Sequence, residues 1–203
     1  MQLLTMEQGS PDWLAARLGR VTMSELKTLL VKGKGPGGFG TGAFSYMYQL
    51  MGERITGELA EPFQGNVHTR RGHALEGVAR ELYQDATGEP EAREVGLILN
   101  QGVGYSPDSL VGENGLLEIK TKLPKYQIEV LLNGEIPTEH IAQCQGGLWV
   151  SEREWIDFVS YWPGMPLFIK RAYRDDILIR RIAERVDAFH EEMDRRLAQV
   201  MAA

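Results

Sequence analysis

The stretch SPDSLVGENGLLEIKTK, residues 106–122, decides the fold class of this 203-residue chain. Its turn-forming run GENG, at 112–115, separates two apolar segments and predicts a β-hairpin. Side chains alternate along a strand, so Glu118 and Lys120 project from the same face of the second strand. The turn would fold Asp108 back beside them. We therefore expect two carboxylates and one ammonium to converge at a single point.

Such a cluster suits Mg²⁺ or Mn²⁺, because these cations prefer oxygen ligands and keep positions open for water and substrate phosphate. The side chain of Ile119 points into the core, and its main-chain carbonyl is a further candidate ligand. Lys120 is suited to orienting an attacking water and to balancing charge on the phosphate. A single Glu-x-Lys triplet is common by chance, so a surface hairpin with a cross-strand ion pair remains an alternative at this point.

A third carboxylate, Glu76, lies on a predicted helix over 69–86 that carries apolar residues at helical spacing. An acid beside an apolar face is costly if it is buried without a partner. Glu76 therefore either points toward the metal pocket or forms a surface pair with Arg80, one turn further along. The two interpretations are equally supported by the residues alone.

The segment HIAQCQGGLWVS, residues 140–151, supplies the remaining polar candidates. Gln143 falls one helical turn after His140, and its amide can hold a water or a phosphate oxygen without adding charge. His140 is a candidate donor behind the site or a DNA contact, although a lone histidine is more often structural. Cys144 is interpreted as a core residue, and as the only cysteine it excludes an intrachain disulfide.

The pattern of the whole chain predicts one mixed α/β (α+β) domain over residues 1–203, with a central mixed sheet flanked by helices. We expect strands at 93–100, 102–107, 115–121, 154–162 and 167–173. We expect helices at 11–18, 22–31 and 43–57, after Pro124, from Pro137 to about 150, and over 175–202. Between the second and third helices lies a glycine-rich run at 32–42, which lacks the features of a phosphate-binding P-loop and is predicted to be mobile.

Composition points to a globular chain with a sizeable core, with 43% hydrophobic and 25% charged residues. No apolar run is long enough to cross a membrane, and the start has no signal-peptide pattern, so we expect a cytoplasmic protein without a membrane partner. The net charge of −6 argues mildly against a nucleic-acid partner. Its distribution argues the other way, because five basic residues face only Glu25 between positions 17 and 34: Arg17, Arg20, Lys27, Lys32 and Lys34. That stretch is a candidate phosphate contact or an ordinary solvated face.

Taken together, five motifs in order resemble the family of phage lambda exonuclease and its YqaJ-type relatives, within the PD-(D/E)xK nuclease superfamily. They are W-L-x-x-R-L-G-x-V-T-x-S-E (13–25), G-x-x-x-E-x-x-A (72–79), S-P-D-x-L (106–110), L-E-I-K (117–120) and A-Q-x-Q-x-x-x-W-V (142–150). The resemblance implies a restriction-endonuclease-like core over about 66–173, preceded by the N-terminal helices and followed by the C-terminal helix.

The resemblance also implies an activity. Family members digest one strand of linear duplex DNA from 5′ to 3′ with Mg²⁺, release mononucleotides and leave a 3′ overhang for a single-strand annealing protein. They form toroidal trimers around DNA. We accordingly expect a metal-dependent exodeoxyribonuclease with two Mg²⁺ ions per site, replaceable by Mn²⁺, in a bacterial cell and encoded by a phage or prophage. The same metal core leaves a structure-specific or restriction-type endonuclease as an alternative, and a catalytically silent DNA-binding scaffold as another.

The resemblance assigns roles residue by residue. Asp108, Glu118 and the Ile119 carbonyl hold metal, Lys120 and Glu76 handle the nucleophilic water, and Gln143 supports the site. Arg17 and Ser24 take the terminal 5′-phosphate, with Ser106 as a further contact. Further DNA contacts are expected at Arg20, Lys32, Lys34 and His140.

The chain departs from the lambda enzyme at two places near the site, where Leu75 and His140 replace aromatic residues, and in its glycine-rich loop. These departures leave the catalytic residues unchanged. They alter the positions that would separate the two strands and hold the DNA. Met23, Phe39 and Met47 are candidates for a wedge that separates the strands.

Overall fold

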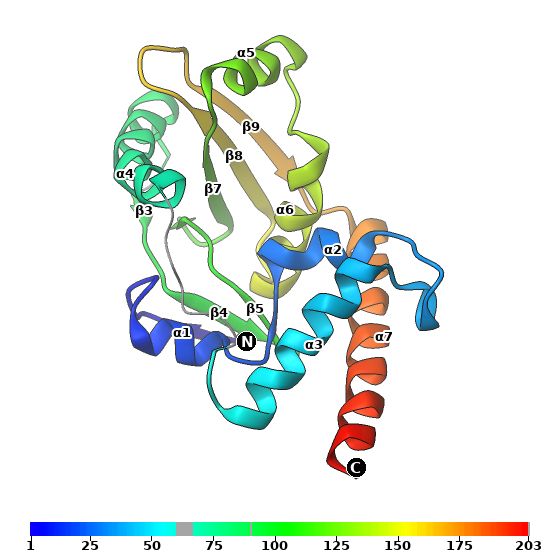
Figure 1. The fold of residues 1–203 in the computed structure, drawn as a ribbon. Helices are drawn as coiled ribbons and strands as arrows, with labels where there is room; N and C mark the ends of the chain where they lie inside the picture. Colours follow the sequence, from blue (N-terminus) through cyan, green and yellow to red (C-terminus); the bar gives the residue numbers. More distant parts are fainter. Residues whose placement is uncertain (60–66, 90, 203) are drawn as a thin grey trace.

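The computed structural model describes residues 1–59, 67–89 and 91–202. Within these residues the chain forms two β-sheets surrounded by helices (Figure 1). The five-stranded sheet has the order β3-β6-β7-β8-β9, and the four-stranded sheet has the order β1-β4-β5-β2. The expected mixed sheet flanked by helices is therefore confirmed by the five-stranded sheet, and the second sheet is an addition that the sequence pattern did not predict.

The five-stranded sheet carries the decisive hairpin. Its strands are β3 (Ala92–Arg93), β6 (Ser109–Val111), β7 (Gly115–Thr121), β8 (Trp155–Tyr161) and β9 (Phe168–Tyr173). The β6–β7 hairpin is antiparallel, with Ser109 opposite Leu117, whereas β7 and β8 are parallel over their full length. Leu116, Leu117 and Ile119 are all buried, as expected for a central strand that is covered on both faces.

The four-stranded sheet lies below it in Figure 1, toward the N-terminal helix. Its strands are β1 (Gln2–Leu4), β2 (Val21–Thr22), β4 (Leu97–Asn100) and β5 (Val103–Tyr105). The predicted strand at 93–100 is wrong in one respect, because β3 and β4 are separate and belong to different sheets. The break lies at Gly96, where a side chain would collide with the main chain of Met6, so the backbones approach too closely for any other residue.

The α-helices are α1 (Pro11–Arg17), α2 (Leu26–Leu30), α3 (Thr41–Thr56), α4 (Val67–Thr87), α5 (Pro124–Asn133), α6 (Thr138–Ser151) and α7 (Asp176–Met201). Two 3₁₀ turns, η1 (Met23–Glu25) and η2 (Pro36–Gly38), flank α2. The Ser10 side chain accepts a hydrogen bond from Trp13 N, and Pro11 occupies the first turn, so α1 begins where the sequence predicts.

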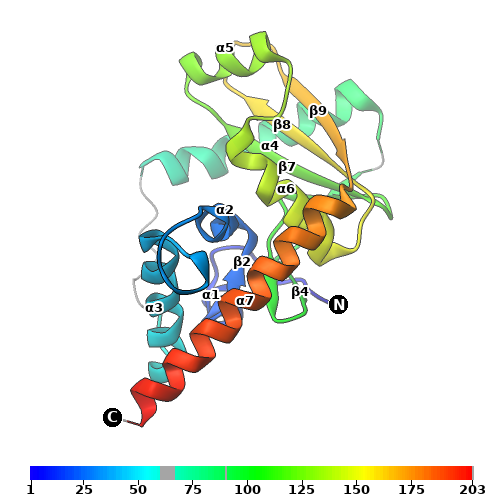
Figure 2. The same ribbon diagram turned by 90° about the vertical axis from the view of Figure 1, so that its right-hand side faces the viewer.

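Helix α4 covers one face of the five-stranded sheet, and α6 crosses the other face (Figures 1 and 2). Under α4, Ala79 and Tyr83 pack with Leu117, Ile119 and Val159. The larger core lies on the α6 side and extends to α2, α3 and α7. Because the two faces of β7 pack against different helices, a residue on β7 faces either α4 or α6 according to its position.

The glycine-rich run at 32–42 is anchored, in contrast to the mobile loop expected from its composition. The Arg185 guanidinium of α7 donates to the carbonyls of Leu29, Gly37 and Gly38. It also lies over the ring of Phe39, 3.6 Å from the centroid. Phe39 is buried by this packing, and so are Met23 and Met47, with at most 1% of each residue exposed. All three are core residues, so the suggested strand-separating wedge is wrong.

Candidate active site

The β6–β7 hairpin brings Asp108 beside the second strand, as predicted. The first strand of the hairpin is, however, β6 and not the expected strand at 102–107, because β5 belongs to the four-stranded sheet. The main-chain N–H of Asp108 donates to the carbonyl of Leu117 at 3.2 Å. The Asp108 carboxylate then accepts from the N–H of Ile119 at 2.5 Å. Strand pairing between β6 and β7 ends at Ser109, so this carboxylate occupies the place of the next strand residue. The N–H and C=O of one strand residue point to the same edge, so the Ile119 carbonyl faces the open edge beside Asp108.

Glu118 projects from the opposite face of β7 to Ile119, toward α6, and is 1% exposed. Its Oε1 atom accepts from Lys120 Nζ and from Gln143 Nε2, both at 2.6 Å. Its Oε2 atom accepts from the Tyr105 hydroxyl at 2.8 Å. Glu118, Lys120 and Gln143 therefore meet as the sequence suggested, and the surface-hairpin alternative is excluded because the carboxylate is buried.

The electrostatics of the cluster reflect this burial. Burial and the nearby negative charge of Glu118 raise the pKa of Asp108 well above its usual range. Burial alone would lower the pKa of Lys120, but the attraction of Glu118 and Asp108 outweighs it and raises that pKa. Lys120 is consequently an ammonium, which can orient a water or stabilise a phosphate but cannot accept a proton.

The donor set fits a hard divalent cation. Two carboxylates and a main-chain carbonyl would supply oxygen ligands. A cation between the carboxylates would relieve their repulsion, which adds to burial in raising the pKa of Asp108. In the part of the chain that the structure describes, no three His, Cys, Asp or Glu side chains converge closely enough to form a metal site by themselves.

Glu76 lies on α4 near this cluster and is half-buried. It lines, together with Asp108, a cavity of about 470 Å³. Its negative charge contributes to the raised pKa of Asp108, after burial and Glu118. The alternative partner, Arg80, is engaged elsewhere: its guanidinium binds Glu94 at 2.5 Å, Ser109 Oγ at 2.9 Å and the Asp108 carbonyl at 3.3 Å. Glu76 and Asp108 therefore share one cavity, and the role of Glu76 as an acid of the site stays a prediction.

A second group of side chains surrounds Arg17 at the end of α1. The guanidinium of Arg17 lies over the indole of Trp13, 4.1 Å from the ring centroid. Its Nη1 atom is 3.5 Å from Ser106 Oγ, which also accepts from Trp13 Nε1 at 2.9 Å. Burial lowers the pKa of Arg17, although the nearby Tyr46, Glu25 and Glu53 act in the opposite direction. A guanidinium can bind a phosphate through two parallel hydrogen bonds.

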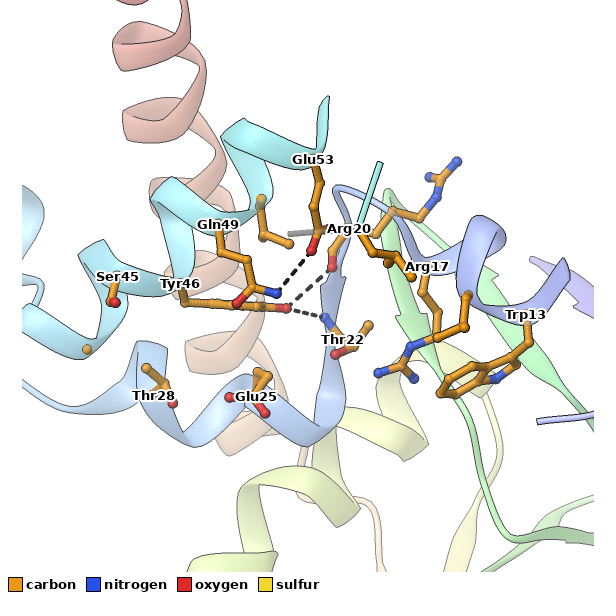
Figure 3. Close-up of a pocket in the computed structure, with 14 residues that line it drawn as sticks. Trp13, Arg17, Arg20, Thr22, Glu25, Thr28, Ser45, Tyr46, Gln49 and Glu53 are labelled. Atoms are coloured by element: carbon orange, nitrogen blue, oxygen red, sulfur yellow. Dashed lines mark hydrogen bonds between the residues drawn. The ribbon is translucent and has the colours of Figure 1, made fainter. Parts of the chain in front are cut away.

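The Arg17 group opens on a cavity of about 880 Å³, which Figure 3 shows between α1 and α3. Thr22 also lines it, and Thr22 Oγ1 lies 3.2 Å from the exposed Ser24 Oγ. Ser106 is two residues before Asp108 in the chain. The structure thus brings Arg17 and Ser106 together and places Ser24 beside Thr22, which lines the cavity.

The other residues that were expected to contact DNA do not form a single group. Arg20, Lys32 and Lys34 are exposed, and the two lysines belong to the loop that Arg185 anchors on α7. His140 is half-buried, and its Nε2 atom lies 2.8 Å from Lys122 Nζ. Among its described contacts His140 has no hydrogen bond to the carboxylates.

Three residues of the site were not predicted to belong to it: Tyr105, Arg80 and Trp13. Tyr105 is fully buried and lies against α6, where a side chain at Gly147 would collide with its ring. No local pattern identifies Tyr105 or Arg80, because their partners are in other elements. Trp13 had a signal, since it lies four residues before Arg17 and the two share one face of a helix.

Comparison with known proteins agrees with these features. Residues 12–154 match the YqaJ-like viral recombinase domain. The crystal structure of an alkaline exonuclease, LHK-Exo, from Laribacter hongkongensis is 36% identical, with a TM-score of 0.85 over 95% of this chain and 97% of that chain. Its complex with dAMP gives a TM-score of 0.84 at 36% identity, over 94% and 96% of the two chains.

A phage-related exonuclease from Haemophilus somnus 129PT shares the fold at 20% identity, with a TM-score of 0.67 over 89% of this chain and 96% of that chain. No curated protein matches the sequence. No helix among the described residues is long and apolar enough to span a membrane. The domain match covers more than half of the chain and coincides with the site, so this chain belongs to the YqaJ-like viral recombinase family.

Proposed function

We propose that this protein is a Mg²⁺-dependent 5′→3′ exonuclease that acts on the ends of linear double-stranded DNA, releases 5′-mononucleotides and leaves 3′ overhangs. The observation that carries the proposal is the convergence of Asp108, Glu118 and Lys120 on one buried hairpin, with Arg17 and Ser106 beside it. The similarity to LHK-Exo, an alkaline exonuclease, supports a nuclease of the lambda exonuclease type, and its complex with the mononucleotide dAMP supports the expected product.

Asp108, Glu118 and the Ile119 carbonyl would hold Mg²⁺, with Mn²⁺ as a substitute and two ions per site. When bound, the metal polarises the phosphodiester and lowers the pKa of an attacking water. Gln143 and Tyr105 fix the orientation of the Glu118 carboxylate through its two oxygens. Arg80 fixes the main chain of Asp108 from the opposite helix.

Lys120 and Glu76 have different roles at the nucleophilic water. The Lys120 ammonium stays protonated beside Glu118 and stabilises negative charge on the phosphate oxygens. Glu76 approaches from α4 and is the candidate to accept the proton of the attacking water.

The terminal 5′-phosphate would lie between Arg17, Ser106 and Ser24. A guanidinium stacked on Trp13 is held in one orientation and makes two parallel hydrogen bonds to a phosphate. Arg20, Lys32 and Lys34 would contact the backbone further from the reacting bond. Holding the end of the strand fixes which bond reaches the carboxylates, and this accounts for release of one nucleotide at a time.

We also propose a homotrimer that encircles the duplex and acts in the bacterial cytoplasm with a single-strand annealing protein. In such a ring only the inner wall needs positive charge, which is compatible with the net charge of −6.

A digestion assay tests the proposal. Linear duplex DNA with 5′-phosphates should be degraded in Mg²⁺ and left intact in EDTA, and duplex without 5′-phosphates should be degraded more slowly. A closed circular duplex should be untouched, because cleavage of the circle would indicate the endonuclease alternative. DNA binding without digestion under any divalent metal would indicate the silent scaffold.

A further inference from the structure

A second lysine lies next to the catalytic cluster. Lys122 follows the last residue of β7 and precedes α5, and 18% of its side chain is exposed. Its ammonium contacts His140 Nε2 at 2.8 Å and Glu139 Oε1 at 3.1 Å. None of the roles assigned above uses this ammonium.

His140 is arranged to hold Lys122 in place. Its ring stacks on the buried ring of Phe158, with the centroids 5.3 Å apart. Burial, followed by the positive charges of Lys122 and Lys120, lowers the pKa of His140 to about 3. The ring is therefore neutral, and Nε2 accepts a hydrogen bond from the Lys122 ammonium. The second ammonium near the site is thus oriented by a rigid, uncharged partner.

Lys122 continues the row that Glu118 and Lys120 begin. His140 and Gln143 are one turn apart on α6 and contact Lys122 and Glu118 respectively. The side chains of Glu118, Lys120 and Lys122 consequently face the same helix. Two residues of extended chain separate the Lys120 and Lys122 backbones by about 7 Å, which is comparable to the span of one nucleotide.

Lys122 lies on the other side of the carboxylates from the Arg17 group. Figures 1 and 2 show α1 and α5 at opposite ends of β7. Arg17 ends α1, and Lys122 leads from β7 into α5. The two cations therefore flank the catalytic cluster along the sheet.

We propose that Lys122 binds the DNA phosphate on the 3′ side of the scissile bond, and that His140 is its positioning residue. This inference rests on the proposed function, because Arg17 is assigned there to the phosphate on the 5′ side. The ligand is one internal phosphodiester of the strand being degraded. The present partner, Glu139, is half exposed, so its ion pair with Lys122 is weak and a phosphate can displace it.

The experiment removes the charge on each side of the contact in turn. The substrate is a 5′-phosphorylated duplex in which the linkage 3′ to the scissile bond is a neutral methylphosphonate, and the readout is single-turnover release of the first nucleotide. In the wild type this replacement should slow release about 10-fold. In Lys122→Met release from the ordinary duplex should already be slowed about 10-fold, and the methylphosphonate should cause no further loss.

Lys125→Met is the matched control, because Lys125 is an exposed lysine on α5 that stacks on Tyr126. It should respond to the methylphosphonate as the wild type does. An undiminished 10-fold effect of the methylphosphonate in Lys122→Met overturns the inference. Glu139→Gln provides a change of opposite sign, since it frees Lys122 and should lower KM about 2-fold or more, whereas a purely structural role predicts no gain.

DNA binding in EDTA separates this inference from the proposed exonuclease activity. The salt dependence of affinity for the phosphorylated duplex should fall by about one unit of slope in Lys122→Met and stay unchanged in Lys125→Met. This comparison is decisive even if the wild type fails to digest DNA, which would refute the proposed function alone. Equal slopes in the two variants would refute the Lys122 contact alone.

Discussion

The Asp108 carboxylate accepts a hydrogen bond from the N–H of Ile119, across the open end of the β6–β7 hairpin. The Asp108 side chain thus accepts the next inter-strand hydrogen bond, in place of the β6 main chain. The same bond holds the carboxylate at the edge that the Ile119 carbonyl also faces. One interaction therefore stabilises the hairpin and positions two of the proposed metal ligands.

Replacing Asp108 with asparagine separates this structural role from the chemical one. The amide oxygen of Asp108→Asn can still accept from Ile119 N, but the negative charge next to Glu118 is lost. We expect Mg²⁺-dependent digestion to fall by at least about 100-fold. Thermal unfolding without metal should occur at the same temperature as in the wild type or higher, because the buried charge and its repulsion by Glu118, which together raise the pKa of Asp108, are removed. A clear loss of stability would show that the charge supports the fold.

Tyr105→Phe tests whether the buried hydroxyl orients Glu118. Removing the hydroxyl leaves Glu118 Oε2 without its donor, which should cost about 1–3 kcal/mol of unfolding free energy and lower kcat about 10-fold. Urea unfolding and single-turnover digestion measure the two effects.

Tyr83→Phe is the matched control, because the Tyr83 hydroxyl donates to the buried carboxylate of Asp157 at 2.7 Å, away from the cluster. It should lose stability and keep its kcat. Equal effects of both variants on kcat would mean that Tyr105 acts only through stability.

The part of the site that strand periodicity predicted is local in the chain, whereas the pairing of Arg17 with Ser106, 89 positions apart, was expected only from the family resemblance. Asp108, Glu118 and Lys120 are joined by one tight turn, so strand periodicity alone places them together. The Tyr105 contact depends on a second sheet packing against α6, and the contact of Trp13 with Ser106 joins residues 93 positions apart. Such contacts are set by tertiary packing, which a local pattern does not encode.

The glycine-rich loop is a second case in which tertiary packing overrides the prediction from the local sequence. Its composition predicts mobility, and its aromatic residue suggested a wedge. The fold instead places Arg185 of α7 against the loop carbonyls and buries Phe39 in the core. Composition predicts the conformational freedom of the isolated segment. In the folded chain, hydrogen bonds from the distant Arg185 hold the loop in one conformation.

Arg17→Lys tests the terminal phosphate site. Lysine keeps the positive charge but loses the bidentate geometry and the stacking on Trp13. The ratio of initial digestion rates on phosphorylated and unphosphorylated ends should fall about 10-fold. Arg20→Lys, at an exposed neighbouring position, should preserve the ratio. An unchanged ratio in Arg17→Lys would place the 5′-phosphate elsewhere.

The pH dependence of stability tests the neutral state of His140. Its pKa in the folded protein is lowered to about 3, by burial first and then by Lys122 and Lys120, from an ordinary value of 6.5. Between these two values the unfolded chain binds a proton that the folded chain does not, so the wild type loses stability as the pH falls below about 6.5. His140→Gln removes this titration. Relative to its difference at pH 8, the variant should gain on the order of 1 kcal/mol over the wild type at pH 5 in urea unfolding. A constant difference between the two proteins from pH 8 to pH 5 would show that His140 titrates alike in both states, and the neutral ring that holds Lys122 would then be wrong.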